Sequence, residues 1–410
     1  MSQDDVIKKL VQQYEYYQPQ EMLAKVRERN QQLTIGIPKE TNQDEFRVAL
    51  RPEAVRLLVA NGHEVVIETG AGEKCKYTDH EYSDAGAQIK YSAKEVFQSE
   101  IVLKVTPPTL KELEEMQSKK TLISTLHLAN VTPEYLHAIN RKKITAIAYE
   151  MLEDKEGGLP VVRSMSEIAG STVMLIAAEY LSSANEGQGI ILGGITGVAP
   201  TNVVVLGSGT VGEYAARTAL GLGASVKIFD SSVPMLRRIK YNLSQPHLFT
   251  SIFDLGTLKS ALEEADVVVG AIRPENGRTP SVVTEEMVSR MKPNSIIIDV
   301  SIDYGGCIET SETTSHHKPI YKKYDVIHYC VPNIPSRVAR TATNALSNIF
   351  APLLLRAGEL GSIEEMIYAD MGFAKGVYSY QGGLTNQHLS KKFNMRFKDI
   401  SLIAAAKQGM

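Results

Sequence analysis

Short apolar runs alternate with helical segments twice along the chain. The first half has the β-branched runs LTIGI, EVVIE, EIVLKV, TLISTL and ITAIAYE, separated by helical segments such as 52–61 and 133–142. The second half has VVVL at 203–206, VKIFD at 226–230, DVVVGAI at 266–272, SIIIDV at 295–300 and VIHYCV at 326–331. Apolar strands alternating with helices are typical of βαβ units, whose parallel sheets are buried on both faces. The pattern therefore predicts an α/β protein with mostly parallel sheets.

The order of these elements predicts two Rossmann-like domains, with a cofactor domain inserted in a substrate domain. Residues 164–185 have the pattern of one long helix that links the halves, and the pattern turns helical again after Pro335. We expect these C-terminal helices to rejoin the substrate domain. The expected units are an N-terminal helical extension at 1–32, a substrate domain at 33–162 and 340–410, and a cofactor domain at 163–339.

Composition narrows the class of protein. The 410 residues carry a formal net charge of −3, which makes nucleic acid and anionic membranes poor partners. The N-terminus is charged throughout, and we expect no membrane-spanning run, so the protein is expected to be cytoplasmic. Three widely spaced cysteines argue against a disulfide framework. The doublet His316–His317 has no cysteines nearby, so we expect a solvated loop there and no metal site.

A glycine-rich turn directly follows the apolar strand at 203–206 and opens a helical run at 213–222. It reads Gly207-Ser208-Gly209-Thr210-Val211-Gly212, a GxGxxG pattern. In such turns the first glycine permits the tight bend, the second lets backbone N–H groups approach a pyrophosphate, and the third lets helix and strand pack closely. The helix N-terminus adds partial positive charge. The segment therefore predicts dinucleotide binding.

Asp230 ends the next strand, eighteen residues after Gly212. A carboxylate there accepts hydrogen bonds from the adenosine ribose and repels a 2′-phosphate, which favours NAD over NADP. Arg237 and Arg238 stand too far along the chain to form an obvious clamp for that phosphate.

Four ionisable residues lie within or at the ends of other strand-like runs: Arg47, Lys104, His127 and Asp303. Each has an ordinary alternative. The two cations could be surface charges, the histidine a hydrogen-bonded core residue, and the aspartate a turn residue beside Tyr304-Gly305-Gly306. Taken singly, none of them would predict a reaction.

Together with their surroundings they resemble the alanine dehydrogenase and pyridine nucleotide transhydrogenase alpha-subunit family. The resemblance runs from about Leu33 to about Leu355 and is strongest toward alanine dehydrogenase, because STLHLA supplies a histidine that the transhydrogenase branch lacks. It is carried by GIPKE with RVAL, NGHEVVIETGAG, LKV, LHLA, AIAYE, SMSEIAG, LGSGTVG, EEMVSRMKPNSIIIDVSIDYGG and HYCVPNIP.

The resemblance implies roles for these residues in reversible, NAD-dependent oxidative deamination of L-alanine to pyruvate and ammonia. Arg47 and Lys104 would bind the carboxylate and carbonyl of a 2-oxo acid, and we expect neither cation to be satisfied when the site is empty. His127 and Asp303 would be the two acid/base groups. Two further residues occupy family positions near the cofactor and could equally be an ordinary helix residue and a turn residue: Ser166 and Asn333. A homo-oligomer, a hexamer by resemblance, is also implied.

Several segments depart from the family pattern and leave the substrate open. Arg51-Pro52 follows RVAL, and extra arginines stand in the loops at 273–280 and 335–341. Arg273, Arg278 and Arg337 could recognise a bulkier or more acidic oxo acid, form a subunit contact, or be surface divergence. The alternatives are therefore a related amino-acid dehydrogenase with another side-chain preference, a soluble NAD(H)-binding transhydrogenase subunit, and a non-catalytic NAD-binding regulator.

Overall fold

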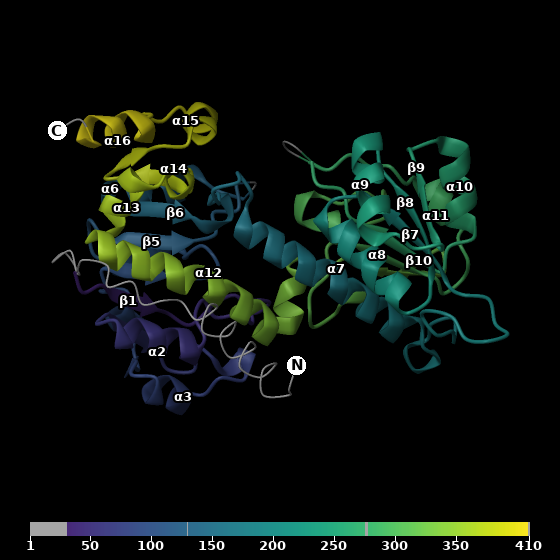
Figure 1. Cartoon of the computed structure of the whole chain (residues 1–410), viewed down its shortest axis with the longest axis horizontal. Helices are drawn as coiled ribbons and strands as arrows, with labels where there is room; N and C mark the ends of the chain where they lie inside the picture. The colour runs from purple at the N-terminus through teal and green to yellow at the C-terminus, as the bar shows by residue number, and fades with distance from the viewer. Residues whose placement is uncertain (1–30, 129, 275–277, 409–410) are drawn as a thin grey trace, which may run out of the picture.

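The computed structural model describes residues 31–128, 130–274 and 278–408. They form two lobes joined by long helices (Figure 1). The described strands make one eight-stranded and one seven-stranded sheet, both mostly parallel. The predicted α/β class is confirmed, whereas the expected helices of the N-terminal extension fall at 1–30, outside the described residues.

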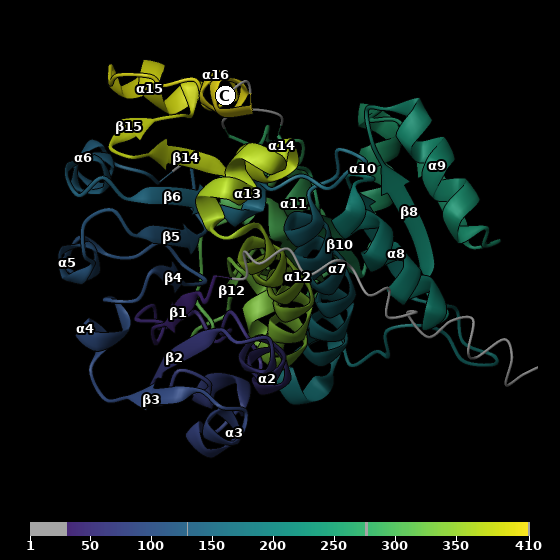
Figure 2. The same cartoon turned by 60° about the vertical axis from the view of Figure 1, so that its left-hand side comes forward.

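The first sheet combines the first half of the chain with part of the tail. Its order is β15-β14-β6-β5-β4-β1-β2-β3, which Figure 2 displays from top to bottom. Strands β1 to β6 are parallel, and β14 and β15 are antiparallel. The strands are β1 Thr34–Ile37, β2 Glu64–Glu68, β3 Gln88–Lys90, β4 Ile101–Leu103, β5 Thr121–Ser124, β6 Thr145–Ala148, β14 Val377–Tyr380 and β15 Gly383–Leu384.

The second sheet has the order β12-β13-β11-β10-β7-β8-β9. Without the antiparallel edge strand β12, this is the 3-2-1-4-5-6 order of dinucleotide-binding folds, whose ligand crevice lies where the order reverses, between β7 and β10. The strands are β7 Asn202–Leu206, β8 Ser225–Phe229, β9 Leu248–Ser251, β10 Val267–Gly270, β11 Ile296–Asp299, β12 Ile320–Lys323 and β13 Val326–Tyr329.

Helices cover both sheets, and several begin at positions that the sequence marks. Proline stands at the start of α2, α6 and α7, where a missing N–H costs nothing, and Thr78 and Thr109 form capping boxes at α3 and α5. The helices are α2 Pro52–Ala60, α3 Asp79–Asp84, α4 Ala93–Val96, α5 Leu110–Glu115, α6 Pro133–Arg141, α7 Pro160–Leu181, α8 Thr210–Gly221, α9 Val233–Leu243, α10 Leu255–Glu263, α11 Glu285–Val288, α12 Ala339–Leu360, α13 Ile363–Ala369, α14 Met371–Ala374, α15 Gln387–Phe393 and α16 Ile400–Gln408.

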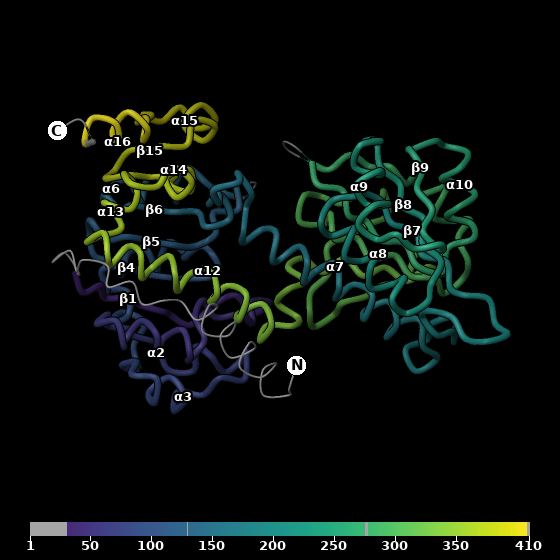
Figure 3. The backbone as a smooth tube through the Cα atoms, viewed as in Figure 1, coloured from purple at the N-terminus to yellow at the C-terminus, as the bar shows by residue number. Residues whose placement is uncertain are grey.

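Two 22-residue helices, α7 and α12, carry the chain between the lobes and contact each other (Figure 3). Helix α7 is long and apolar enough to cross a membrane by length and composition, so the expectation of no such run is wrong. Ten of its residues are nevertheless buried in the protein, and it packs closely on α8. A core helix passes the same test, which makes its composition weak evidence for a membrane span.

Five strands were not predicted. β3, β9 and β12 are edge strands of their sheets, and most of their residues are only partly buried or exposed. A strand with one open side needs fewer apolar residues, so its pattern is weak. β14 and β15 stand in the tail, where we expected no strand. The tail forms strands because β14 pairs in antiparallel fashion with the side of β6 that the parallel strands leave open.

Candidate functional site

Residues of the candidate substrate site follow the carboxyl ends of four adjacent strands of the first sheet. The strands are neighbours in the order β6-β5-β4-β1 and run parallel. Glu40 comes after β1, Lys104 directly after β4, His127 after β5 and Glu150 after β6. Parallel strands bring their carboxyl ends to the same edge of a sheet, so these residues gather along one edge, as ligand sites in open α/β folds do.

Lys104 is fully buried and has a carboxylate partner. Its Nζ lies 2.7 Å from Glu40 Oε2 and 2.9 Å from Thr106 Oγ1, with Glu112 at 3.9 Å. The Glu40 carboxylate also accepts a hydrogen bond from the Val105 backbone N–H. Burial raises the pKa of Glu40, and the charge and hydrogen bond of Lys104 only partly oppose that rise. The surface-charge alternative for Lys104 is therefore wrong.

Arg47 is buried and pairs with Glu45 through two parallel hydrogen bonds. Its Nε lies 2.7 Å from Glu45 Oε1 and its Nη2 lies 2.6 Å from Glu45 Oε2, while Nη1 contacts Met165 Sδ at 3.3 Å. Burial alone would lower the pKa of Arg47, but the charge and hydrogen bonds of Glu45, with smaller contributions from Tyr149 and Glu40, together raise that pKa. Paired guanidinium and carboxylate groups of this kind are strongly oriented.

Both candidate substrate-binding cations, Arg47 and Lys104, are thus satisfied by carboxylates of the chain itself. The expectation that neither is satisfied in the empty site is wrong. The physical reason is that an unpaired charge in a buried position costs several kcal/mol, so a folded protein supplies a counterion even where a ligand will later bind. A ligand that binds these cations would use the N–H groups that Glu40 and Glu45 leave free.

His127 is exposed and has a left-handed backbone conformation, with φ of 50°. The Glu150 carboxylate holds its segment by accepting hydrogen bonds from the N–H groups of Leu126 at 2.8 Å and His127 at 3.3 Å. Surrounding protein atoms reduce hydration of the imidazole, and the charge of Arg47 adds to this, so the pKa of His127 is lowered. Its accessibility excludes the core-histidine alternative.

Asp303 lies in a short 3-10 turn, Val300–Tyr304, directly after β11 in the second sheet. Loss of hydration raises the pKa of Asp303 to about 6, although its hydrogen bond from Asn333 and the charge of Arg47 oppose the rise. The bond runs from the Asn333 backbone N–H to Asp303 Oδ1 at 3.3 Å. The Asn333 side chain donates to Glu45 Oε2 at 2.8 Å, which joins the second sheet's loop to the Arg47 segment.

Ser166 stands on α7, one residue from Met165, which contacts Arg47. The structure therefore brings Arg47, Asp303 and Asn333 into one connected group and places Ser166 beside it in sequence. Electrostatic interaction links His127 to Arg47, and Glu40 interacts electrostatically with both Arg47 and Lys104.

The glycine turn has the geometry of a phosphate cradle. Gly207 has φ of 106°, a conformation that side chains disfavour, and a Cβ there would meet the Ala271 carbonyl oxygen at 2.5 Å. A Cβ at Gly209 would meet nothing within 4 Å, so the backbone in front of α8 is open to a ligand. Open backbone at a helix N-terminus fits the pyrophosphate of a dinucleotide.

Asp230 holds this turn from the end of β8. Its Oδ2 accepts hydrogen bonds from the Ser208 backbone N–H at 2.7 Å and the Ser208 hydroxyl at 2.6 Å. Its Oδ1 accepts from the Ser232 N–H at 2.8 Å. Arg238 also reaches the turn, since its Nη2 donates to the Ser208 carbonyl at 3.0 Å. From its position in the sequence we expected Arg238 to lie too far from the glycine turn, but helix α9 places its side chain beside that turn.

Two of the divergent arginines, Arg278 and Arg337, have partners of their own. Arg337 pairs with Glu179 on α7 and lies over the Tyr329 ring, and Arg278 donates to the Gly305 carbonyl at 3.2 Å. Arg337 therefore contributes to contacts of α7 rather than to the substrate group. His316 is half-buried and packs against the Phe46 ring, which corrects the expected solvated loop. Within 31–128, 130–274 and 278–408, no group of three His, Cys, Asp or Glu residues could hold a metal.

Three carboxylates of the site, Glu40, Glu45 and Glu150, were missed as functional candidates. For Glu45 the sequence spacing could have indicated the pair, because Glu45 and Arg47 are two residues apart, and in an extended segment that spacing places side chains on the same side. The other two were visible in the GIPKE and AIAYE segments. Their roles as counterion and as loop anchor depend on contacts between strands, which spacing does not reveal.

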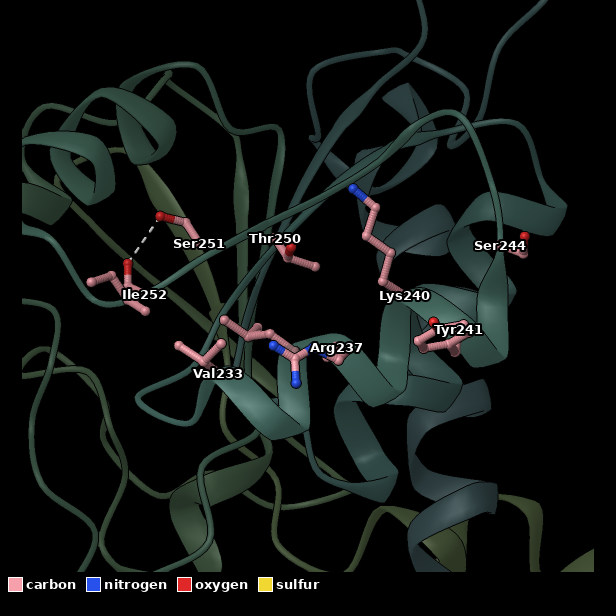
Figure 4. Close-up of a pocket in the computed structure, with 9 residues that line it drawn as sticks. Val233, Arg237, Lys240, Tyr241, Ser244, Thr250, Ser251 and Ile252 are labelled. Carbon is pink, nitrogen blue, oxygen red and sulfur yellow. Dashed lines mark hydrogen bonds between the residues drawn. The ribbon is translucent and has the colours of Figure 1, made fainter.

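A separate pocket of about 600 Å³ lies on the second lobe between α9 and β9 (Figure 4). None of the candidate residues lines it. Its lining residues are Val233, Leu236, Arg237, Lys240, Tyr241, Ser244, Thr250, Ser251 and Ile252.

Comparison with known proteins decides the family. Residues 36–169 match the family described as "Alanine dehydrogenase/PNT, N-terminal domain", and residues 173–387 match "Alanine dehydrogenase/PNT, C-terminal domain". The chain belongs to the alanine dehydrogenase/PNT family. The predicted resemblance is confirmed, and the two matched regions cover the strands of both sheets.

Members of this family resemble the chain along most of its length. An alanine dehydrogenase from Mycolicibacterium smegmatis is 37% identical over 374 residues, which span 91% of this chain and 100% of that protein. A solved L-alanine dehydrogenase has a TM-score of 0.83 at 39% identity and covers 88% of this chain and 99% of its own. A transhydrogenase from Sinorhizobium meliloti has a TM-score of 0.74 at 23% identity, covering 87% and 99%, and shows the shared fold.

Proposed function

We propose that this protein is an NAD-dependent alanine dehydrogenase. The reaction converts L-alanine, NAD⁺ and water reversibly into pyruvate, ammonium, NADH and a proton. The proposal rests on one observation above all. Arg47, Asn333 and Asp303, which the family resemblance assigns to substrate, cofactor and proton transfer, form a connected group between the two sheets.

The family uses a nicotinamide cofactor, and the open backbone at Gly209 fits its pyrophosphate. We assign Gly207, Ser208, Gly209, Thr210, Val211 and Gly212 to the phosphates, Asp230 to the adenosine ribose, and Ser166 and Asn333 to the nicotinamide side. Asp230 supports NAD over NADP, because a carboxylate repels a 2′-phosphate. When bound, the nicotinamide supplies the hydride acceptor, and the protein supplies orientation and charge.

Arg47 and Lys104 hold the substrate's carboxylate and oxygen in this proposal. Glu45 takes the Nε and one Nη2 hydrogen of Arg47, which leaves the end of the guanidinium for a carboxylate. Lys104 has three donors, and Glu40 and Thr106 take two of them. Each cation can therefore bind a small anion without leaving its internal partner.

His127 and Asp303 move the protons. The lowered pKa of His127 keeps its imidazole neutral near pH 7, so it can accept a proton from the attacking water. Asp303, with a pKa of about 6, is mostly ionised at pH 7 and can take a proton from the substrate nitrogen or return one. Water adds to the imine carbon, and ammonia leaves as the oxo acid forms.

Purified protein tests the proposal directly. We expect NADH to form from NAD⁺ with L-alanine, and to be consumed with pyruvate and ammonium. A panel of L-amino acids measures the side-chain preference. NADH binding without turnover of any amino acid would overturn the proposal and favour the transhydrogenase-subunit reading. A non-catalytic regulator would keep its biological activity in the Lys104→Ala and His127→Ala variants.

Three further proposals accompany this function. The division into a substrate domain at 33–162 and 340–410 and a cofactor domain at 163–339 is supported by the separate sheets that these segments form. A cytoplasmic location and a homo-oligomer, a hexamer by family resemblance, are the others. Light scattering of the purified protein measures the assembly.

A further inference from the structure

Glu45 is a fully buried carboxylate at which two parts of the site meet. Its Oε1 accepts hydrogen bonds from the Arg47 N–H at 3.0 Å and from Arg47 Nε at 2.7 Å. Its Oε2 accepts from Arg47 Nη2 at 2.6 Å and from Asn333 Nδ2 at 2.8 Å. These four donors, with a longer contact from the Ser336 hydroxyl to Oε1 at 3.4 Å, use the main acceptor sites of a carboxylate. Burial alone would raise the pKa of Glu45, but Arg47 and Asn333 outweigh burial, so that pKa is lowered and the group stays ionised.

This arrangement fixes which edge of Arg47 is available. A guanidinium offers a carboxylate two edges, one formed by Nε and Nη2 and the other by Nη1 and Nη2. Glu45 occupies the first edge, and Met165 Sδ lies 3.3 Å from Nη1. Any substrate carboxylate that binds Arg47 must approach the second edge. Glu45 therefore determines the direction from which Arg47 can hold its ligand.

Asn333 links the Glu45–Arg47 pair to Asp303, which follows a strand of the second sheet. It has a left-handed conformation, with φ of 58°, which aims its backbone N–H at Asp303 and its side chain at Glu45. The neighbouring Ser336 is buried and strengthens the junction, since its hydroxyl accepts from the Phe46 N–H at 2.8 Å and donates to the Asp44 carbonyl at 2.9 Å. The Arg47 segment and the Asp303 side of the site therefore keep a common position.

We propose that Glu45 is a positioning residue that, through its bond to Asn333, sets Arg47 in register with Asp303 and couples substrate binding to the nucleotide side of the site. The inference rests on the proposed function. It predicts that breaking the Glu45–Asn333 bond weakens binding of the oxo acid without an equal loss of nucleotide binding.

Asn333→Gly is the sharpest test. Glycine keeps the left-handed backbone and the N–H that donates a hydrogen bond to Asp303, and of these two bonds only the one from the side chain to Glu45 is lost. The matched control is Asn294→Gly. Asn294 also has a left-handed backbone, with φ of 59°, and one side-chain hydrogen bond, from Lys322 at 3.0 Å. Glu45→Gln, and the double variant with Asn333→Gly, complete a double-mutant cycle.

The measurements are the Kd of NADH by fluorescence, the Kd of pyruvate for the NADH-loaded protein, kcat, and thermal melting. We expect Asn333→Gly to weaken pyruvate binding about five-fold and Glu45→Gln at least about ten-fold. NADH binding should change less than about two-fold in Glu45→Gln, because Glu45 is not assigned to the nucleotide, and the NADH affinity of Asn333→Gly is measured separately, because Asn333 is assigned to the nicotinamide side. The double variant should be no weaker than Glu45→Gln within about a factor of two, because both changes remove the same contact. Asn294→Gly should match the unmodified protein.

Two results overturn the inference: unchanged pyruvate affinity in Asn333→Gly, or losses that multiply in the double variant. Asn333→Gly creates no buried unpaired charge, so it decides the matter even where Glu45→Gln does not fold. Failure of the proposed function is distinct. In that case the unmodified protein shows no turnover. If it still binds pyruvate, the comparison of affinities tests the bond between Glu45 and Asn333, and if it binds no pyruvate, the inference is overturned together with the proposed function.

Discussion

Replacing Lys104 by methionine removes a fully buried positive charge and keeps most of the aliphatic stem. Glu40 then loses the cation 2.7 Å from its Oε2 while staying buried. Because its pKa is already raised by burial, losing the charge of Lys104 raises that pKa further, and the carboxyl becomes protonated in the folded protein. The destabilisation is then set by the free energy of protonating Glu40.

The size of the effect depends on pH. The ordinary pKa of this carboxyl is 4.5, and each pH unit above it costs about 1.36 kcal/mol, so keeping Glu40 neutral costs about 3.4 kcal/mol at pH 7. At pH 5 the same cost is about 0.7 kcal/mol. Between pH 5 and pH 7, Glu40 of the variant is protonated in the folded state and mostly ionised in the unfolded state. The free energy of unfolding of the variant therefore falls as the pH rises.

Urea unfolding followed by circular dichroism at pH 5, 6 and 7 measures this cost as the difference from the unmodified protein. The control is Lys104→Met with Glu40→Gln, because glutamine cannot ionise and still offers an oxygen to the Val105 N–H. We expect the control to lose the pH dependence. An equal destabilisation of Lys104→Met at pH 5 and pH 7 would refute the reasoning. Both variants should lose measurable pyruvate binding, because Lys104 is gone in each.

Three further predictions concern other parts of the site. Asp303→Asn should lower turnover by about 10²–10⁴-fold. It should also remove the rise in the rate of alanine oxidation as the pH increases through about 6, where the Asp303 carboxylate becomes available as a base. A rise retained in the kcat–pH profile would contradict this role. Glu150→Ala leaves the Leu126 and His127 N–H groups without an acceptor, which costs about 1–3 kcal/mol for the part-buried Leu126 N–H and less for the exposed His127 N–H, whereas Glu150→Gln should restore most of the loss in urea unfolding. Equal losses in the two variants would show that the anchor is not a hydrogen bond. Asp230→Ser removes the acceptor for Ser208 and the repulsion of a 2′-phosphate, so the preference for NADH over NADPH in fluorescence titrations should fall about ten-fold or more. An unchanged preference would remove Asp230 from cofactor selection.

Much of the fold could be predicted because buried parallel strands have a strong pattern. All strands at the centres of both sheets have apolar runs, and the ends of three of them led to Lys104, His127 and the Arg47 segment. The outer strands β3 and β9 were missed because they are packed on fewer sides. The strands of the tail were missed because pairing with β6, rather than local sequence, gives them their place.

The sequence by itself determined the α/β class, the dinucleotide turn and the residue types of the candidate site. These are local properties: the side-chain pattern of one strand, or the glycine spacing of one turn. Only the tertiary structure decided how the charges are neutralised. Glu45 and Asn333 are 288 positions apart, and Lys104 is 64 positions from Glu40. A buried charge requires a partner in space, and the fold can supply it from any distance along the chain.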